Sequence, residues 1–360
     1  MTTKVLKLIE TLRGGADRFP RHKELLLLSG MTPEEQSALR EAWPHIPLLT
    51  RRQLVAALGY LAEADATATF EEVFLLATED PDEEVRLAAL RGLWDYDEEA
   101  FVPTLIQIMD SDSSAPVRAE AAIILGKFAM LGELEELEPE TTDLVRRALL
   151  AVWNSPDEDV EVRRRALESV SCLATDEVNE MIQAAYSDKD ERMNISAVYA
   201  MGQTLDDMWA PYVLKELKNP RPEMRYEAAH AAGELTLTDA IPTLLDLAHD
   251  ADAEVRVAAI TALGNIGGER AVEALLSLAR SADEATRDAA LDALELAIFA
   301  EDPLSLRAWE WAMFWDTEFE PGAEDELQEE WDDEWGVELD EAEDEDEDDW
   351  EHDGARDRWN

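Results

Sequence analysis

The chain has 360 residues, a formal charge of −53 at pH 7 and a single cysteine, Cys172. Such a charge disfavours direct binding to nucleic acid and to anionic membranes, because both repel an acidic protein. One cysteine excludes an intrachain disulfide and a cysteine-based zinc site.

The acidity favours basic proteins as partners, although an acidic, lysine-poor surface is also typical of proteins from a salty cytoplasm. The first residues lack the apolar region and cleavage site of a secretory signal. No apolar run reaches the roughly 20 residues that a membrane helix needs. We therefore predict a cytoplasmic protein that contacts neither membranes nor nucleic acid, and we leave its oligomeric state open.

Residues 1–49 are mildly basic and are predicted to form an N-terminal helical cap. The stretches KVLKLIETL (residues 4–12) and TPEEQSALREAW (residues 32–43) both have the apolar spacing of amphipathic helices. Thr32, Pro33 and Glu35 have the pattern of a capping box with proline at the first helical position. The second helix should therefore begin directly after Thr32.

Residues 50–300 carry a repeat with a period of about 31 residues, which is typical of stacked repeat proteins. It is clearest in VRVAAITALG (residues 255–264), MRYEAAHAAG (residues 224–233) and VRLAALRGLW (residues 85–94). Apolar residues at steps of three and four predict two helices in each unit. The many alanines favour close packing of each helix pair against the next. The predicted fold is all-α, a right-handed α-solenoid of about seven to eight helix pairs.

The acidic turn, the Val-Arg pair and the Ala-Leu-Gly ending, as in Asp252–Gly264, resemble the HEAT-repeat family. The likeness is to the HEAT-like repeats of the phycobilin lyase type in particular. It implies that the second helix of each unit lines the concave side. It also implies that the arginine bonds to acidic residues of a turn, often in the next unit. The resulting structural ladder would contain Arg86, Arg118, Arg163, Arg225, Arg256 and Arg287.

The repeat is interrupted in two places. Gly132–Asp143 lengthens one unit, either as a longer helix or as a projecting loop. Loops on rigid scaffolds often carry function, so this stretch is a candidate contact site or a neutral insertion. Asn194 stands where the other units have arginine.

Larger side chains gather around Asn194, and they predict a binding surface. Tyr199 and His230 share one repeat position, five residues after the arginine position, and Tyr226 follows its arginine directly. These positions should face outward on the second helix, where exposed aromatic residues mark binding surfaces. We predict partner binding by Tyr199, Tyr226 and His230, together with Trp209. The alternative is that these side chains belong to the core.

The C-terminal residues depart from the repeat. Residues 301–320 are rich in aromatic residues and are predicted to cap the last repeat. Residues 321–360 are acidic with few aliphatic residues and are predicted to be disordered. Trp331 and Trp335 would share one face of a transient helix, which favours a second partner contact. The alternatives are docking on the basic N-terminal region of the same chain, or a tail that only solubilises the protein.

No catalytic or metal-binding pattern stands out. None of the five histidines is followed by glutamate, whereas HEAT-type deoxyhypusine hydroxylases bind iron through His-Glu pairs. We therefore expect no metal, no cofactor and no enzymatic activity. The leading hypothesis is a non-catalytic scaffold or adaptor that binds a protein on its concave face. The alternative is a HEAT protein, associated with a lyase or an oxidoreductase, that handles a tetrapyrrole or another cofactor on a client protein.

Overall fold

The computed structural model describes residues 4–14, 19–65, 67–280 and 283–301. Every regular element among these residues is a helix, which confirms the predicted all-α class. The chain divides into two units, Met1–Pro303, which contains the described residues, and Leu304–Asn360. The second unit, and with it the predicted aromatic cap beyond Glu301, the acidic tail, Trp331 and Trp335, lies outside the described residues.

The N-terminal region contains three α-helices and two short 3-10 helices. They are α1 (Lys4–Arg13), α2 (His22–Leu25), η1 (Leu26–Leu28), α3 (Pro33–Ala42) and η2 (Trp43–His45). α1 packs against α3, and Leu12 and Leu39 are buried there. The backbone nitrogen of Thr32 donates to the Glu35 carboxylate at 3.1 Å, and the Thr32 hydroxyl accepts from the Glu35 nitrogen at 3.4 Å. The predicted capping box is therefore present.

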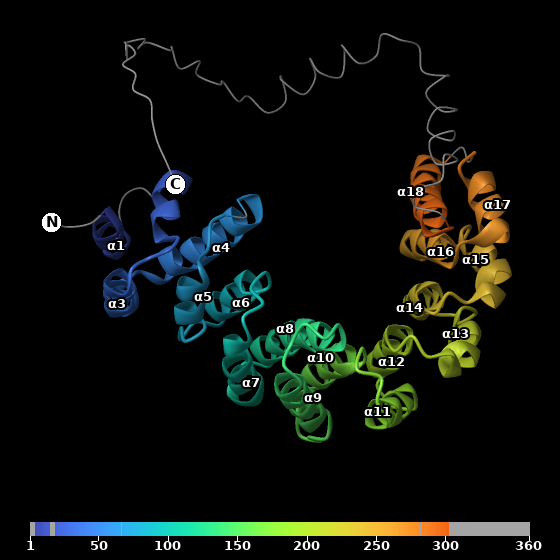
Figure 1. Cartoon of the computed structure of the whole chain (residues 1–360), viewed down its shortest axis with the longest axis horizontal. Helices are drawn as coiled ribbons and strands as arrows, with labels where there is room; N and C mark the ends of the chain where they lie inside the picture. The colour runs from blue at the N-terminus through green and yellow to red at the C-terminus, as the bar shows by residue number, and fades with distance from the viewer. Residues whose placement is uncertain (1–3, 15–18, 66, 281–282, 302–360) are drawn as a thin grey trace, which may run out of the picture. The chain divides into compact units, whose positions relative to one another are not determined.

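From α4 onward the helices alternate between two layers, as Figure 1 shows. The first helices of the pairs are α5 (Glu71–Ala77), α7 (Val102–Ser111), α9 (Pro139–Trp153), α11 (Asp176–Tyr186), α13 (Ala210–Glu216), α15 (Ile241–Leu247) and α17 (Gly268–Leu278). The short helices η3 (Glu99–Phe101), η4 (Asp207–Trp209) and η5 (Thr238–Ala240) precede α7, α13 and α15.

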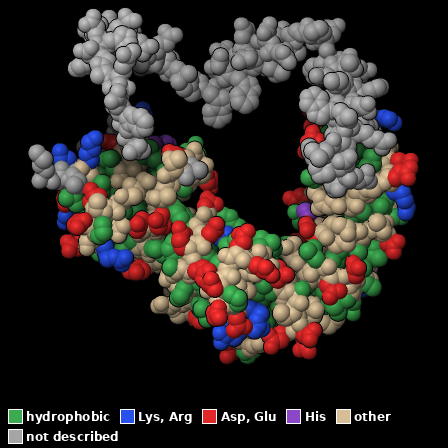
Figure 2. Space-filling model, in the orientation of Figure 1, with side chains coloured by type: hydrophobic (Ala, Val, Ile, Leu, Met, Phe, Trp, Pro, Cys, Tyr) green, Lys and Arg blue, Asp and Glu red, His purple; other side chains and the backbone are tan. Residues whose placement is uncertain are grey.

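The second helices form the other layer. They are α4 (Leu48–Ala64), α6 (Glu83–Gly92), α8 (Ala115–Glu133), α10 (Val160–Val170), α12 (Glu191–Gln203), α14 (Pro222–Glu234), α16 (Ala253–Ile266) and α18 (Glu284–Glu301). The described residues thus contain seven complete pairs, α5/α6 to α17/α18, in agreement with the predicted number. We call the surface of these helices that points away from the first helices the second-helix face. Figure 2 shows acidic side chains spread widely over the described surface.

Each second helix packs against the next one, from α8 through α10, α12, α14 and α16 to α18. Glycines allow the close approach. A Cβ on Gly202 would lie 2.8 Å from the Cα of Ala231, and a Cβ on Gly233 would lie 3.0 Å from the Cα of Ala262. Each glycine is the last residue but one of its helix, and each meets the next second helix there, so both serve helix contact. The apolar core forms two clusters that meet at α6.

The insertion Gly132–Asp143 extends α8 and adds the start of α9. The short connection between them contains Glu135, whose φ is 61°. Glu99 holds this connection, because its carboxylate accepts hydrogen bonds from the nitrogen of Glu138 at 3.1 Å and the hydroxyl of Thr141 at 2.7 Å. The insertion is therefore bonded back onto the neighbouring unit through η3.

Arginines of the second helices join neighbouring units at the turns. Arg86 donates twice to the Asp112 carboxylate, at 2.8 Å each, and once to the carbonyl of Asp80 at 2.9 Å. Arg225 donates in the same way to Asp250, again at 2.8 Å twice. Such two-pronged pairs fix both the distance and the orientation of the partners.

The other ladder positions vary around this scheme. Arg118 donates to Glu158 at 2.6 Å and to the carbonyl of Asp112 at 2.7 Å. Arg256 donates to the carbonyl of Asp250 at 2.9 Å, and Arg287 forms an ion pair with Asp288 at 3.7 Å. Arg163 differs from the expectation, since it donates to the carbonyl of Trp153 and lies 4.7 Å from the centre of that ring.

Asn194 keeps half of the arginine's role. Its amide nitrogen donates to the carbonyl of Asp188 at 2.9 Å, six residues earlier, as the arginines do at their own turns. Arg225 and Asp250 are 25 residues apart, and the residue 25 positions after Asn194 is Asn219. Asn219 therefore stands where the acidic partner in the next unit would be. One charged rung of the ladder is thus replaced by two asparagines.

Candidate functional site

Three of the predicted binding residues line one small cavity between α12 and α14. Tyr199 comes from α12, while Tyr226 and His230 lie one turn apart on α14. The rings of Tyr226 and His230 have centres 4.6 Å apart and planes at 65°, an edge-to-face arrangement. The cavity has a volume of about 250 Å³, and we call it the smaller cavity. Tyr199 is 37% exposed, so the cavity opens on the second-helix face.

A larger cavity of about 620 Å³ adjoins it. It extends across α8 and α10 to α12, and it shares Tyr199, Gln203 and Glu227 with the smaller cavity. Trp94 and Met130 contribute exposed apolar surface to its lining. The two cavities together form a continuous hollow that carries both aromatic and charged side chains.

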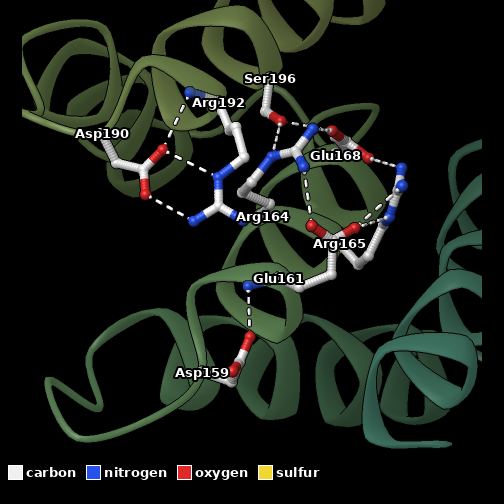
Figure 3. Close-up of polar contacts among 8 residues, drawn as sticks. All are labelled: Asp159, Glu161, Arg164, Arg165, Glu168, Asp190, Arg192 and Ser196. Atoms are coloured by element: carbon white, nitrogen blue, oxygen red, sulfur yellow. Dashed lines mark hydrogen bonds and ion pairs between the residues drawn. The ribbon is translucent and has the colours of Figure 1, made fainter. Parts of the chain in front are cut away.

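Two arginines of α10 dominate the polar part of the larger cavity (Figure 3). Arg164 donates to Glu161 at 2.7 Å and to the hydroxyl of Ser196 on α12 at 2.9 Å. Arg165 donates to Glu161 at 3.0 Å and to Glu168 at 2.7 Å. The Ser196 hydroxyl in turn donates to Glu168. Both guanidinium groups are therefore matched by carboxylates of their own helix.

Glu227 lies beside this network but is not bonded into it. No residue in the described part of the chain donates a hydrogen bond to its carboxylate. Burial raises the pKa of Glu227 to about 7, and the charge of Glu168 adds to the increase, while Arg164 and Arg165 act against it. Glu227 is thus a carboxylate that borders both cavities and lacks a donor.

The aromatic side chains of the smaller cavity are uncharged at neutral pH. Burial lowers the pKa of His230, although the charge of Glu234 opposes this. Burial also raises the pKa of Tyr199 and of Tyr226 above the ordinary value for tyrosine. The cavity therefore combines neutral rings with the carboxylates of Glu227 and Glu234.

The structure corrects the prediction for Trp209. Its side chain is 1% exposed and packs edge-to-face against Tyr212, with ring centres 5.6 Å apart. η4 turns the indole into the core between the helix layers, so Trp209 cannot contact a partner directly. The prediction of partner binding by Trp209 is wrong.

Sequence reasoning missed the charged residues of the hollow, and one signal could have indicated them. Two residues after the arginine position, Ala88, Ala258 and Ala289 are alanines, whereas the unit of Arg118 has Glu120. The units of the hollow have Arg165, Ser196 and Glu227 there. This position is thus polar in four successive units, from Glu120 to Glu227, with alanine in the units on either side, and the run marks a surface that departs from plain helix packing.

The comparison with family models shows that this chain belongs to the HEAT-repeat family. The model described as HEAT repeats matches residues 47–126, 70–153 and 210–295, which together make up more than half of the chain. The predicted resemblance is therefore confirmed. The matches leave out α10, α11 and α12, and Asn194 interrupts the arginine ladder on α12.

The expectation that the chain is not an enzyme is wrong, because a known enzyme is among its relatives. The chain is 25% identical over 209 residues to the deoxyhypusine hydroxylase of Candida albicans. The match covers 56% of this chain and 59% of the hydroxylase, so the chain spans less than two thirds of that enzyme. The lack of a His-Glu pair does not place the chain outside this group of relatives.

The described residues do not fit the iron that a likeness to these hydroxylases implies. Within residues 4–301 and apart from their gaps, no group of three or more His, Cys, Asp or Glu side chains could hold a metal ion. The described histidines belong to separate elements: His22 to α2, His45 to η2, His230 to α14 and His249 to the turn after α15.

Solved structures of other helical repeat proteins are similar to this chain at low identity. Importin beta is 16% identical, with a TM-score of 0.45, and the match covers 77% of this chain and 44% of that chain. The complex of CpcE and CpcF of phycocyanin lyase from Nostoc sp. PCC7120 is 19% identical, with a TM-score of 0.43 and coverage of 63% and 94%. Among the described helices, none is long and apolar enough to cross a membrane.

Proposed function

We propose that this HEAT-repeat protein binds a protein partner through the hollow on its second-helix face. The observation that supports this most is the shared cavity of Tyr199, Tyr226 and His230, which come from two successive units. Aromatic residues, methionine and arginine are enriched at protein interfaces. The hollow offers all three kinds within one surface, and the net charge of −53 favours a basic partner.

The test is an affinity capture from native lysate, followed by binding measurements with the purified partner. We expect the double variant Tyr199→Ala/Tyr226→Ala to bind the partner at least about tenfold more weakly, since buried aromatic anchors carry much of an interface's free energy. Tyr60→Ala is the matched control, because Tyr60 is 61% exposed on α4 and lines neither cavity.

Circular dichroism separates loss of binding from loss of folding. The double variant should keep the helicity of the wild type. Unchanged affinity, or a loss of helicity that accounts for the weaker binding, would contradict the proposal. The predicted second contact through Trp331 and Trp335 is tested by comparing the full chain with a chain that ends at residue 316.

A second candidate function is the handling of a tetrapyrrole or another cofactor on a client protein. The volume of the larger cavity, about 620 Å³, falls within the range of roughly 300–1,000 Å³ of small-molecule sites. Absorption spectra of the protein with added bilin or haem test this candidate. A shifted spectrum that Tyr199→Ala abolishes would support it, and an unshifted spectrum would contradict it.

A further inference from the structure

Resting on the proposed function, we propose that the smaller cavity receives one cationic side chain of the partner, a lysine or an arginine. The cation would lie among the rings of Tyr199, Tyr226 and His230 and pair with Glu227. The proposal therefore names the feature of the partner that the hollow recognises.

The shape and lining of the cavity fit a single side chain. Its volume of about 250 Å³ is below the roughly 300 Å³ at which small-molecule sites begin. The walls are aromatic, and a cation near an aromatic ring is attracted by the ring's negative face. The rings come from α12 and α14, so they border the site from two neighbouring helices.

The charges of the cavity also fit a cation. Its lining contains the carboxylates of Glu227 and Glu234 and no lysine or arginine. The nearest arginines, Arg164 and Arg165, are held by Glu161, Glu168 and Ser196. The charges of neighbouring residues therefore act on Glu227, but among the described residues none donates a hydrogen bond to its carboxylate.

A half-buried carboxylate without a donor is costly to ionise, because it has lost part of its water and no protein group replaces that water. A cation from a partner would supply the missing donor in a site that is already partly desolvated. The raised pKa of Glu227, about 7, is the expected sign of such an environment. The cation-binding form is the carboxylate, so binding should strengthen as the pH rises from 6 to 8.

Several titratable or charged groups face this site from the neighbouring helices. They are Lys127 on α8, which pairs with Asp97, Arg164, Arg165 and Glu168 on α10, Cys172 after α10, Tyr199 on α12, and Tyr226, His230 and Glu234 on α14. Since the pKa of His230 is lowered and the pKa values of the tyrosines are raised, Glu227 is the group of the smaller cavity that changes charge near pH 7.

The test uses the full chain and three fluorescent peptides of equal length, oligolysine, oligoarginine and oligoserine, in physiological salt. At pH 8 we expect Glu227→Gln to weaken binding of the cationic peptides about tenfold, because the variant loses one charge contact that is partly shielded from water. Glu223→Gln is the matched control, because it removes the same charge from an exposed position at the start of α14. It should change the affinity less than about twofold, since exposed charges are screened by salt.

The comparison of the two cationic peptides shows which side chain the cavity prefers. The wild type should bind both more tightly at pH 8 than at pH 6, and Glu227→Gln should lose most of this difference. Equal losses in Glu227→Gln and Glu223→Gln would overturn the proposal, because they would show attraction by overall charge alone. Tighter binding of oligoserine than of the cationic peptides would also overturn it.

The outcome is independent of the test for partner binding. If Tyr199→Ala/Tyr226→Ala loses the partner while Glu227→Gln keeps its affinity for oligolysine, the proposed function stands and the cation site is rejected. If Glu227→Gln loses the cationic peptides while the tyrosine variant keeps the partner, the cavity binds cations, but the hollow is not the partner site, and the assignment of the cation to the partner is rejected with it.

Discussion

Two carboxylates near α14, Asp250 and Glu227, show how the ladder and the hollow differ. Asp250 accepts two hydrogen bonds from Arg225 at 2.8 Å and one from the nitrogen of Asp252 at 2.9 Å. The bond from Arg225 holds the pKa of Asp250 below its usual value. Glu227 lies only two residues after Arg225, but burial without a donor raises its pKa to about 7.

α14 thus carries a ladder residue, Arg225, at the turn and a residue of the hollow, Glu227, on the second-helix face. At the turn, arginine and aspartate satisfy each other and join neighbouring units. On the second-helix face, a carboxylate is left without a donor where a partner can reach it. The contrast predicts that removal of a carboxylate lowers stability in the ladder and raises it in the hollow. Three experiments test this contrast.

The largest effect is expected from Asp80→Ala, which breaks the buried pair of Asp80 with Arg51 on α4, next to the ladder position Arg86. The Asp80 side chain is fully buried, accepts from the indole of Trp43 at 2.7 Å and forms an ion pair with Arg51 at 2.7 Å. Its loss leaves a buried guanidinium without its carboxylate, so the free energy of unfolding should fall by about 3–5 kcal/mol. Urea denaturation measures this change.

Its control is the adjacent residue. Glu79 pairs with Arg40 at 3.3 Å, and both side chains are more than half exposed. Glu79→Ala should therefore cost less than about 1 kcal/mol. Similar losses for Glu79→Ala and Asp80→Ala would show that burial of the pair does not decide its contribution.

The second effect has the opposite sign. Glu227 ionises near its ordinary value of 4.5 in the unfolded chain but near 7 in the folded chain, so its contribution to stability falls as the pH rises between these values. Glu227→Gln cannot ionise. At pH 8 it should be more stable than the wild type by about 1–3 kcal/mol, and at pH 4 the difference should vanish.

Thermal unfolding of both proteins across this pH range measures the difference, and the other acidic groups cancel in the comparison. Glu223→Gln again serves as the exposed control. A Glu227→Gln protein that is less stable than the wild type at pH 8 would mean that the carboxylate supports the fold, against the contrast drawn above.

The smallest effect is expected from restoring the interrupted rung. Asn194→Arg together with Asn219→Asp recreates the pair found at Arg225 and Asp250, with the same 25-residue separation. The double variant should exceed the sum of the two single variants by about 0.5–1.5 kcal/mol, the usual range of coupling between residues in contact. A double-mutant cycle measures this coupling, and strictly additive effects would show that these two positions do not meet.

The sequence predicts the helix pairs because their signals are local and repeated: apolar spacing, caps and small residues at helix contacts. It also brings Tyr199 and His230 together, because equal repeat positions lie on neighbouring helices. It does not predict the burial of Trp209, which depends on how η4 turns against Tyr212. Nor does it single out Glu227, because carboxylates are common throughout the chain and only the missing donor distinguishes this one.

The departure at Arg163 has a similar cause. The sequence places this arginine in the ladder, but its guanidinium lies over the ring of Trp153 at the end of the lengthened α9. The sequence thus predicts the repeated frame well. Contacts with residues outside the repeat pattern, such as that of Arg163 with Trp153, are seen only in the structure.

The glycine contacts between second helices have a consequence for how such a protein changes length. Gly202, Gly233 and Gly264 each approach an alanine of the following unit, namely Ala231, Ala262 and Ala293. Because the same interlocking surface recurs, a whole unit can be duplicated or removed while each remaining junction keeps a compatible neighbour. The hollow, in contrast, depends on side chains found at one place in the series. Duplication of units outside the hollow can therefore change the number of repeats before or after it while its own side chains stay the same.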